Sequence, residues 1–164
     1  YPSLADIAFL CFYIFFFFLG IYATKKIGVS ITSSRLIEST ILWGLLFAIA
    51  YNFVKFNSQM SDVTPLASFL NLLYPLLDTF LLTLALMVIR SQTGRLQPSL
   101  LYLVFSFLAL TLGDAIFSYQ SANEVYWNGN YVDYLFTIFS YFYAMGSLTL
   151  PRLLQTTSPL KLSN

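Results

Sequence analysis

Long apolar stretches, each of about 20 residues, fill most of this chain, and about 20 residues is the length an α-helix needs to cross a bilayer. The stretches cover roughly 4–24, 36–56, 65–89, 97–119 and 131–150. Only 9% of the residues are charged and 58% are hydrophobic, whereas soluble domains carry roughly 25% charged residues. The sequence therefore predicts an all-α integral membrane protein, a bundle of about five transmembrane helices.

Prolines and polar loops mark where these helices start and stop. Pro65 and Pro98 suit the first turn of the third and fourth helices, and Pro151 is expected to end the fifth. We therefore expect a transmembrane domain over 1–150 and a cytoplasmic tail over 151–164. The first residue is Tyr, not Met, so we expect the chain to be part of a longer protein with one or more earlier spans.

Basic residues predict the orientation of the bundle. Of the eight Lys and Arg residues, seven lie at one set of alternating helix ends: Lys25, Lys26, Arg35, Arg90, Arg95, Arg152 and Lys161. By the positive-inside rule these ends are cytoplasmic, which places the N-terminus outside and the C-terminus inside. We expect a multi-pass protein of a cell membrane, with a prokaryotic plasma membrane favoured. The net charge of +1 gives no electrostatic reason to expect a nucleic-acid partner.

An aspartate in the middle of the third stretch is the most informative polar residue. Asp78 costs about 2.5–3.5 kcal/mol on the insertion scale, and the apolar residues around it offset this cost. Every basic residue lies at a helix end, so the carboxyl has no obvious ion-pair partner at its depth. Asn71, Tyr74 and Asp78 share one helical face, which is expected to point into the bundle. The run of four phenylalanines at 15–18 is expected to face lipid.

Other helices bring polar residues to the same half of the bundle. In the fourth helix, Asp114 and Ser118 share a face, Gly113 would let another helix approach closely, and Tyr119 follows. Asp133 opens the fifth helix and Asp6 opens the first. Asp6 and Asp133 also suit helix capping, Tyr119 suits an interfacial aromatic belt, and interhelical hydrogen bonding remains open for the two deeper acids. We predict a polar pocket in the outer half, lined by these residues.

Several chemistries are disfavoured. The chain has no histidine and one cysteine, Cys11, which argues against histidine zinc sites, haem ligation by histidine and histidine-based triads. No phosphate-binding loop or nucleophile elbow is present. We expect no enzymatic activity and no metal site, and the sequence does not identify a cofactor. A paired-aspartate protease is disfavoured because its motifs are only loosely matched.

Three motifs occur in order along the chain: "PSLADIAFLCFY" at 2–13, "YPLLDTFLL" at 74–82, and "LGDAIFSY" at 112–119 followed by "NGNYVDYLF" at 128–136. In this order they resemble the multi-pass N-terminal membrane domains of prokaryotic diguanylate cyclases and histidine kinases. The matching positions are Pro2, Ser3, Asp6, Tyr13, Tyr74, Pro75, Asp78, Gly113, Asp114, Tyr119, Gly129 and Asp133. The resemblance implies an input domain whose last helix leads into a cytoplasmic signalling module.

The leading hypothesis is therefore a membrane sensor domain that binds a ligand or a cation in the outer-half pocket. The expected partners are the lipid bilayer and a downstream cytoplasmic module, with a homodimer as a further option. Two alternatives stay open: an accessory subunit of a larger membrane complex, and a small proton- or ion-coupled transporter that uses Asp78 and Asp114 as a relay.

Overall fold

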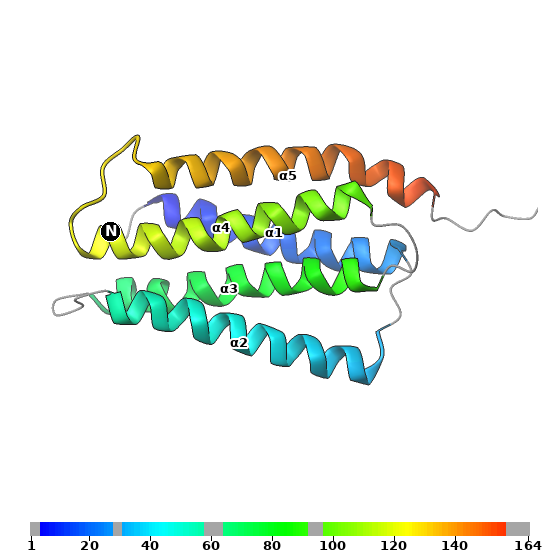
Figure 1. Cartoon of the computed structure of the whole chain (residues 1–164), viewed down its shortest axis with the longest axis horizontal. Helices are drawn as coiled ribbons and strands as arrows, with labels where there is room; N and C mark the ends of the chain where they lie inside the picture. The colour runs from blue at the N-terminus through cyan, green and yellow to red at the C-terminus, as the bar shows by residue number, and fades with distance from the viewer. Residues whose placement is uncertain (1–3, 28–30, 58–63, 92–96, 157–164) are drawn as a thin grey trace, which may run out of the picture.

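The computed structural model describes residues 4–27, 31–57, 64–91 and 97–156. Pro2, Ser3, Arg95 and Lys161, which entered the predictions above, lie outside these ranges, as do residues 157–164 of the expected tail. In the described residues the structure is all-helical: α1 (Leu4–Ile27), α2 (Ser33–Asn57), α3 (Pro65–Arg90), α4 (Pro98–Ala122) and α5 (Tyr131–Thr156) (Figure 1). The prediction of five helices is confirmed, and most predicted ends fall within three residues of the observed ones.

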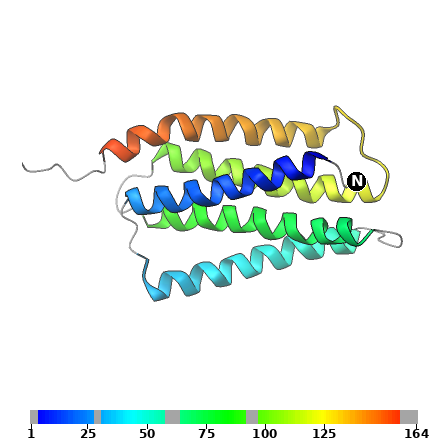
Figure 2. The same cartoon turned by 180° about the vertical axis from the view of Figure 1, so that it is seen from behind.

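The helices alternate in direction, and α2, α3, α4 and α5 lie side by side in chain order (Figure 1). Helix α1 lies on one face of this row, across α3 and α4, as the reverse view shows (Figure 2). Helices α4 and α5 pack most closely, whereas α1 meets α3 and α5 through long side chains. The first helix therefore closes the bundle from one side.

Local sequence signals explain most of the helix ends. The Thr64 hydroxyl accepts a hydrogen bond from the Ala67 N–H at 3.3 Å, and Pro65 follows in the first turn, where no intrahelical N–H is needed. Pro98 occupies the equivalent place in α4. These two helix starts lie where the sequence predicted them.

The prediction that Pro151 ends the fifth helix is wrong, because α5 continues to Thr156. A proline inside a helix removes one N–H donor, and its ring disturbs the preceding turn. The residues after it still donate their N–H groups to carbonyls four residues earlier, so the helix continues. Pro75 is tolerated inside α3 in the same way.

Aromatic residues dominate the centre of the bundle. Tyr13 and Phe16 of α1 pack against Leu81 of α3 and Phe107 of α4. The Phe16 ring also meets the Tyr143 ring of α5 edge-on, with centroids 4.6 Å apart. Of the four phenylalanines at 15–18, three are exposed as expected, but Phe16 is buried. The lipid-facing prediction is therefore wrong for that residue.

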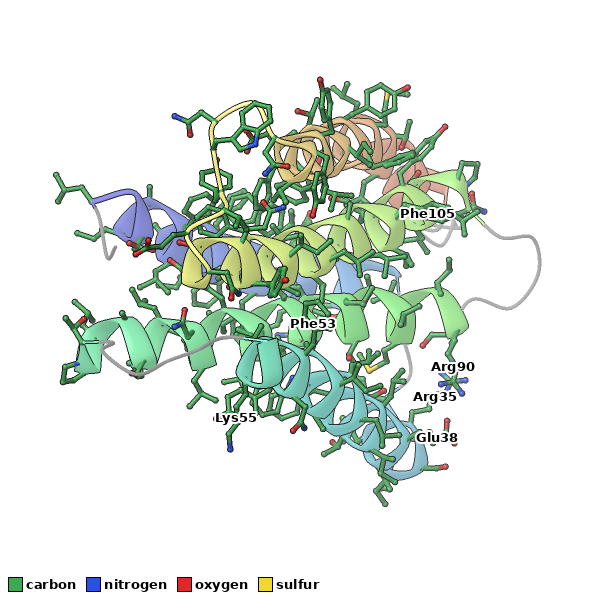
Figure 3. The ribbon with its side chains drawn as sticks, turned by 60° about the vertical axis from the view of Figure 1, so that its left-hand side comes forward. Arg35, Glu38, Phe53, Lys55, Arg90 and Phe105 are labelled. Carbon is green, nitrogen blue, oxygen red and sulfur yellow. The ribbon has the colours of Figure 1, made fainter. Side chains whose placement is uncertain are left out.

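The two ends of the bundle differ in charge. The end where α2 begins and α3 finishes, called the basic end here, carries Arg35 and Arg90, and Arg90 pairs with Glu38 at 3.2 Å. Figure 3 shows these three side chains together, with Lys55 at the far end of α2. The opposite end, where α1 and α5 begin, is called the acidic end, because Asp6 and Asp133 lie in the first turns of those helices.

Within the described residues, three helices are long and apolar enough to cross a membrane: Ser33–Lys55, Pro65–Arg90 and Pro98–Ser121. The apolar part of α1, Asp6–Tyr22, is shorter. Large apolar side chains are exposed on all five helices, among them Phe15, Ile49, Phe69, Phe105 and Leu148. A bilayer would cover such a surface, and the apolar helices are compatible with a membrane protein.

Candidate functional site

A tyrosine and two aspartates from three different helices meet inside the bundle. The Tyr13 hydroxyl donates to Asp78 Oδ1 at 2.5 Å and lies 3.3 Å from Asp114 Oδ2. Because a phenol has one hydrogen to donate, the bond to Asp78 is the stronger of the two. The side chain of Asp78 is almost completely buried, with 1% of its residue surface exposed. This acid cluster, Tyr13, Asp78 and Asp114, links α1, α3 and α4.

The local geometry of α3 holds Asp78 in place. Pro75, one turn earlier, has no N–H to donate, which disturbs the hydrogen-bond ladder there. Thr79 Oγ1 donates to the Pro75 carbonyl at 2.6 Å, and the Trp43 indole N–H donates to the Leu76 carbonyl at 3.2 Å. Both bonds add a side-chain donor to a carbonyl of the turn that begins at the proline. The turn that carries Asp78 is thereby fixed to α2.

The two carboxyls can satisfy each other only if one of them carries a proton. Asp78 Oδ2 is buried and receives no hydrogen bond from the residues that the structure describes. The Tyr13 hydroxyl lies 2.5 Å from one Asp78 oxygen and 3.3 Å from one Asp114 oxygen, so the two carboxyls are close to each other. Ionised carboxylates only accept hydrogen bonds, so a bond between them needs a proton on one partner, and repulsion disfavours two charges at one site. The geometry suits one protonated acid and one charged acid.

A cavity of about 260 Å³ adjoins the cluster at the acidic end. Three carboxyls line it, those of Asp6, Asp114 and Asp133. Three hydroxyl side chains also line it, those of Tyr74, Ser118 and Tyr126, and the apolar wall consists of Phe9, Phe117 and Phe136. The cavity is slightly smaller than the roughly 300–1,000 Å³ of typical ligand pockets, so it suits a small molecule.

The cavity's carboxyls at the helix starts are held by local hydrogen bonds. Tyr74 donates to Asp6 Oδ1 at 2.5 Å. The Gly129 N–H donates to Asp133 Oδ2 at 2.5 Å, and the Tyr126 hydroxyl donates to Asp133 Oδ1 at 3.0 Å. Gly129 has a φ of 89°, a conformation that favours glycine. Desolvation, followed by the hydrogen bond and the charge of Asp133, raises the pKa of Tyr126 above its usual value.

The loop between α4 and α5 is tied to the bundle below it. The buried Asn130 side chain donates to Gln120 Oε1 at 2.9 Å, and the Asn130 carbonyl accepts from the Asp133 N–H at 2.9 Å. Gly113 lies where α5 passes, since a Cβ there would come 3.1 Å from the Phe136 ring. The start of α5 is thus fixed to the end of α4, and Asp133 and Phe136 are held at the cavity wall.

Most of the predicted site residues meet at this cavity. Asp6, Tyr74, Asp114, Ser118 and Asp133 line it, and Asp78 joins it through Tyr13 and Asp114. The two remaining residues do not line it. Asn71 lies half-buried on α3, and the ring of Tyr119 packs toward Phe53 of α2, with centroids 6.4 Å apart.

Site reasoning from the residue patterns missed the aromatic wall and the role of Tyr13. Tyr13 matched the family resemblance, but nothing in its own helix marked it as a partner of Asp78. Tyr126, which the predicted site did not include, donates a hydrogen bond to Asp133. Phe9, Phe117 and Phe136 have no signal beyond their apolar character.

Comparisons with protein families, curated proteins and solved structures find no match to this chain. The fold and the site therefore define a coarse class: an all-helical apolar bundle with a buried acid cluster beside a small cavity at one end. Among the described residues, no group of three Asp, Glu, Cys or His side chains is arranged to hold a metal ion.

Proposed function

We propose that this chain is a membrane-embedded sensor domain. It binds a small ligand or cation in the cavity at the acidic end and passes the signal to a cytoplasmic module. In this proposal all five helices span the membrane, the acidic end faces outward and the basic end faces the cytoplasm. The observation that carries the proposal is the cluster of Tyr13, Asp78 and Asp114, which joins three helices directly beside a cavity.

The packing below the cluster favours binding over transport. Phe16, Leu81, Phe107 and Leu110 form a buried apolar core across the bundle. On the basic side of this core, a cavity of about 50 Å³ is lined almost entirely by apolar side chains and does not include either acid. A transported ion would need polar partners along its path. The geometry therefore fits a site that is filled and emptied from one end.

Helix α5 is the element best placed to carry a signal. Its residues Asp133 and Phe136 line the cavity, and the helix continues without a break to the basic end. Near that end Gly146 packs tightly on α4, since a Cβ there would lie 3.2 Å from the Ser99 carbonyl oxygen. A ligand that binds two arrangements of α5 with different affinity would shift their populations.

The acid pair also meets one requirement of a paired-aspartate hydrolase, because both carboxyls lie close to one hydroxyl, that of Tyr13. Hydrolysis would require a substrate and a water to reach both acids. Asp114 lines the cavity, but Asp78 does not and is 1% exposed. The geometry therefore favours a binding role.

Distance measurements between labelled helices test the sensor proposal. Spin labels at Leu36→Cys and Leu148→Cys, in a Cys11→Ser background, report the separation of α2 and α5 near the basic end in lipid nanodiscs. Both positions are exposed. Asp78→Asn and Asp114→Asn each replace one carboxyl of the pair with an amide of nearly the same shape and should shift the distance distribution. Glu124→Gln, an exposed loop residue outside the cavity wall, should not.

In the full-length protein, Asp78→Asn should change signalling output without preventing membrane insertion. Distance distributions and output that are identical for the parent protein and both aspartate variants would rule out a sensing role for the cluster. Flux through proteoliposomes that depends on Asp78 would instead support the transporter alternative. Copurification with fixed partners, without a downstream domain in the same reading frame, would support an accessory subunit.

A further inference from the structure

The cavity wall combines acidic and aromatic side chains, and this combination indicates a ligand class. The ligand class inferred below rests on the proposed binding function. Lining residues with carboxyl groups supply negative charge, and five lining residues have aromatic rings. No Lys or Arg is among the described residues that line the cavity. A positively charged ligand with apolar groups would match both kinds of wall.

Asp114 is the acid whose charge is least compensated. Asp6 and Asp133 lie in the first turns of α1 and α5, where the helix dipole stabilises a negative charge. Asp114 lies inside α4, away from a helix start. The Tyr13 hydroxyl lies 3.3 Å from its carboxyl and donates its hydrogen to Asp78, at 2.5 Å. A cation in the cavity would therefore gain most from the Asp114 carboxylate.

The buried acid pair contributes one negative charge that a ligand can approach. The Tyr13 hydroxyl lies close to both Asp78 and Asp114, and Asp78 Oδ2 is buried without a donor among the described residues. One proton shared by the pair removes the repulsion between two charges at one site. Of the two acids, Asp114 lines the cavity, so a cation there would neutralise the remaining charge of the pair.

The aromatic walls favour an organic cation over a metal ion. The Phe117 ring meets Tyr126 at 75°, with centroids 4.8 Å apart, and meets Phe136 at 67° with centroids 6.4 Å apart. Aromatic rings set at steep angles surround alkylammonium groups in known cages, through cation–π attraction. A divalent metal would need about six oxygen ligands, and the described acids form no metal-binding group.

We propose that the cavity binds a small organic ammonium ion, with its charged nitrogen against Asp114 and its carbon groups against Phe9, Phe117 and Phe136. The volume of about 260 Å³ limits the ligand to a small molecule. The attraction comes from one carboxylate and several ring surfaces together. An inorganic cation would lack the apolar contacts with the rings, and an uncharged analogue would lack the attraction to the carboxylate.

Choline and its uncharged isostere 3,3-dimethyl-1-butanol provide a matched pair of probes. Isothermal titration calorimetry on the whole chain in nanodiscs should show binding of choline and at least about tenfold weaker binding of the isostere, because one charge pair is lost. Tetramethylammonium and benzylammonium extend the series to other shapes with the same charge.

Three variants locate the binding site. Asp114→Asn should weaken choline binding by about tenfold or more. Phe117→Leu should weaken it by roughly 3- to 30-fold, the range expected for one cation–π contact. Phe105→Leu changes an exposed phenylalanine on the same helix and should leave the affinity unchanged. Circular dichroism and size-exclusion chromatography check that each variant is folded.

Equal binding of choline and its isostere, or no binding by any of the three ammonium probes at millimolar concentration, would overturn this proposal. The outcome is separable from that of the sensor proposal. If no ammonium binds but Asp114→Asn still shifts the α2–α5 distance, the ligand class is wrong and sensing stands. If choline binds at Asp114 without moving α5, the ligand class stands and sensing is wrong.

Discussion

Removal of the Tyr13 hydroxyl is the most direct test of the acid cluster. Tyr13→Phe deletes the donor to Asp78 and leaves the ring in the core. Side-chain hydrogen bonds in membrane proteins contribute about 0.6 kcal/mol on average and about 1.7 kcal/mol at most, and an unsatisfied buried acceptor costs about 1–3 kcal/mol. Asp78 is 1% exposed and already has one oxygen without a donor. We therefore expect a loss of about 2 kcal/mol, near the upper limit of the membrane range.

The free energy of unfolding in mixed micelles, measured by titration with a denaturing detergent, gives this loss directly. Tyr22→Phe is the matched control, because Tyr22 lies on the same helix and is exposed. A double-mutant cycle isolates the bond, since in an Asp78→Ala background the cost of Tyr13→Phe should fall close to zero. The same cost in both backgrounds, or a cost no larger than that of Tyr22→Phe, would refute the hydrogen-bonded cluster.

Two further predictions concern helix packing and the loop at the acidic end. Gly146→Ala should destabilise the protein by about 1–3 kcal/mol through overpacking, because the new Cβ would lie 3.2 Å from the Ser99 carbonyl oxygen. Gly44→Ala, which meets nothing within 4 Å, should be neutral or stabilising by up to about 1 kcal/mol, and unfolding titrations compare the two. Because the pKa of Tyr126 is raised, its stabilising bond to Asp133 should be fully present below the usual tyrosine pKa of about 10. It should be lost as pH rises through the raised value, so the stability difference between the parent protein and Tyr126→Phe should shrink only at high pH.

Hydropathy and helix-start signals were sufficient to predict the five helices of the described chain. Apolar length determines which segments become helical, and prolines after polar loops mark their starts. The end of α5 was mispredicted because Pro151 removes a single donor, and the remaining bonds of the last turns allow the helix to continue. Phe16 was mispredicted because a run of identical residues gives no periodicity from which to choose the buried face.

The site could be predicted only to the level of which helices and which half of the bundle contribute to it. Helical spacing placed Tyr74 and Asp78 on one face, and both contact α1 in the structure. The same spacing included Asn71, which does not line the cavity. Spacing within one helix does not determine how far along the bundle axis the side chains of a neighbouring helix lie. The roles of Tyr13 and Phe117 depend on that depth, so they emerge only from the packed bundle.

The energetics of the acid cluster indicate that stability alone does not explain it. In the proposed membrane setting, an aspartate at a helix centre costs about 2.5–3.5 kcal/mol on the insertion scale, so Asp78 and Asp114 together would cost roughly 5–7 kcal/mol. The hydrogen bond from Tyr13 and one proton shared by the acids would offset about half of this, at the upper limit of about 1.7 kcal/mol each. Leucine at either position would remove the cost, and neighbouring core residues such as Leu81 and Leu110 show that apolar side chains pack well here. What leucine cannot provide is a proton or a negative charge beside a cavity. The chemical need for one of these at Asp114 is therefore the physical basis on which a binding role rests.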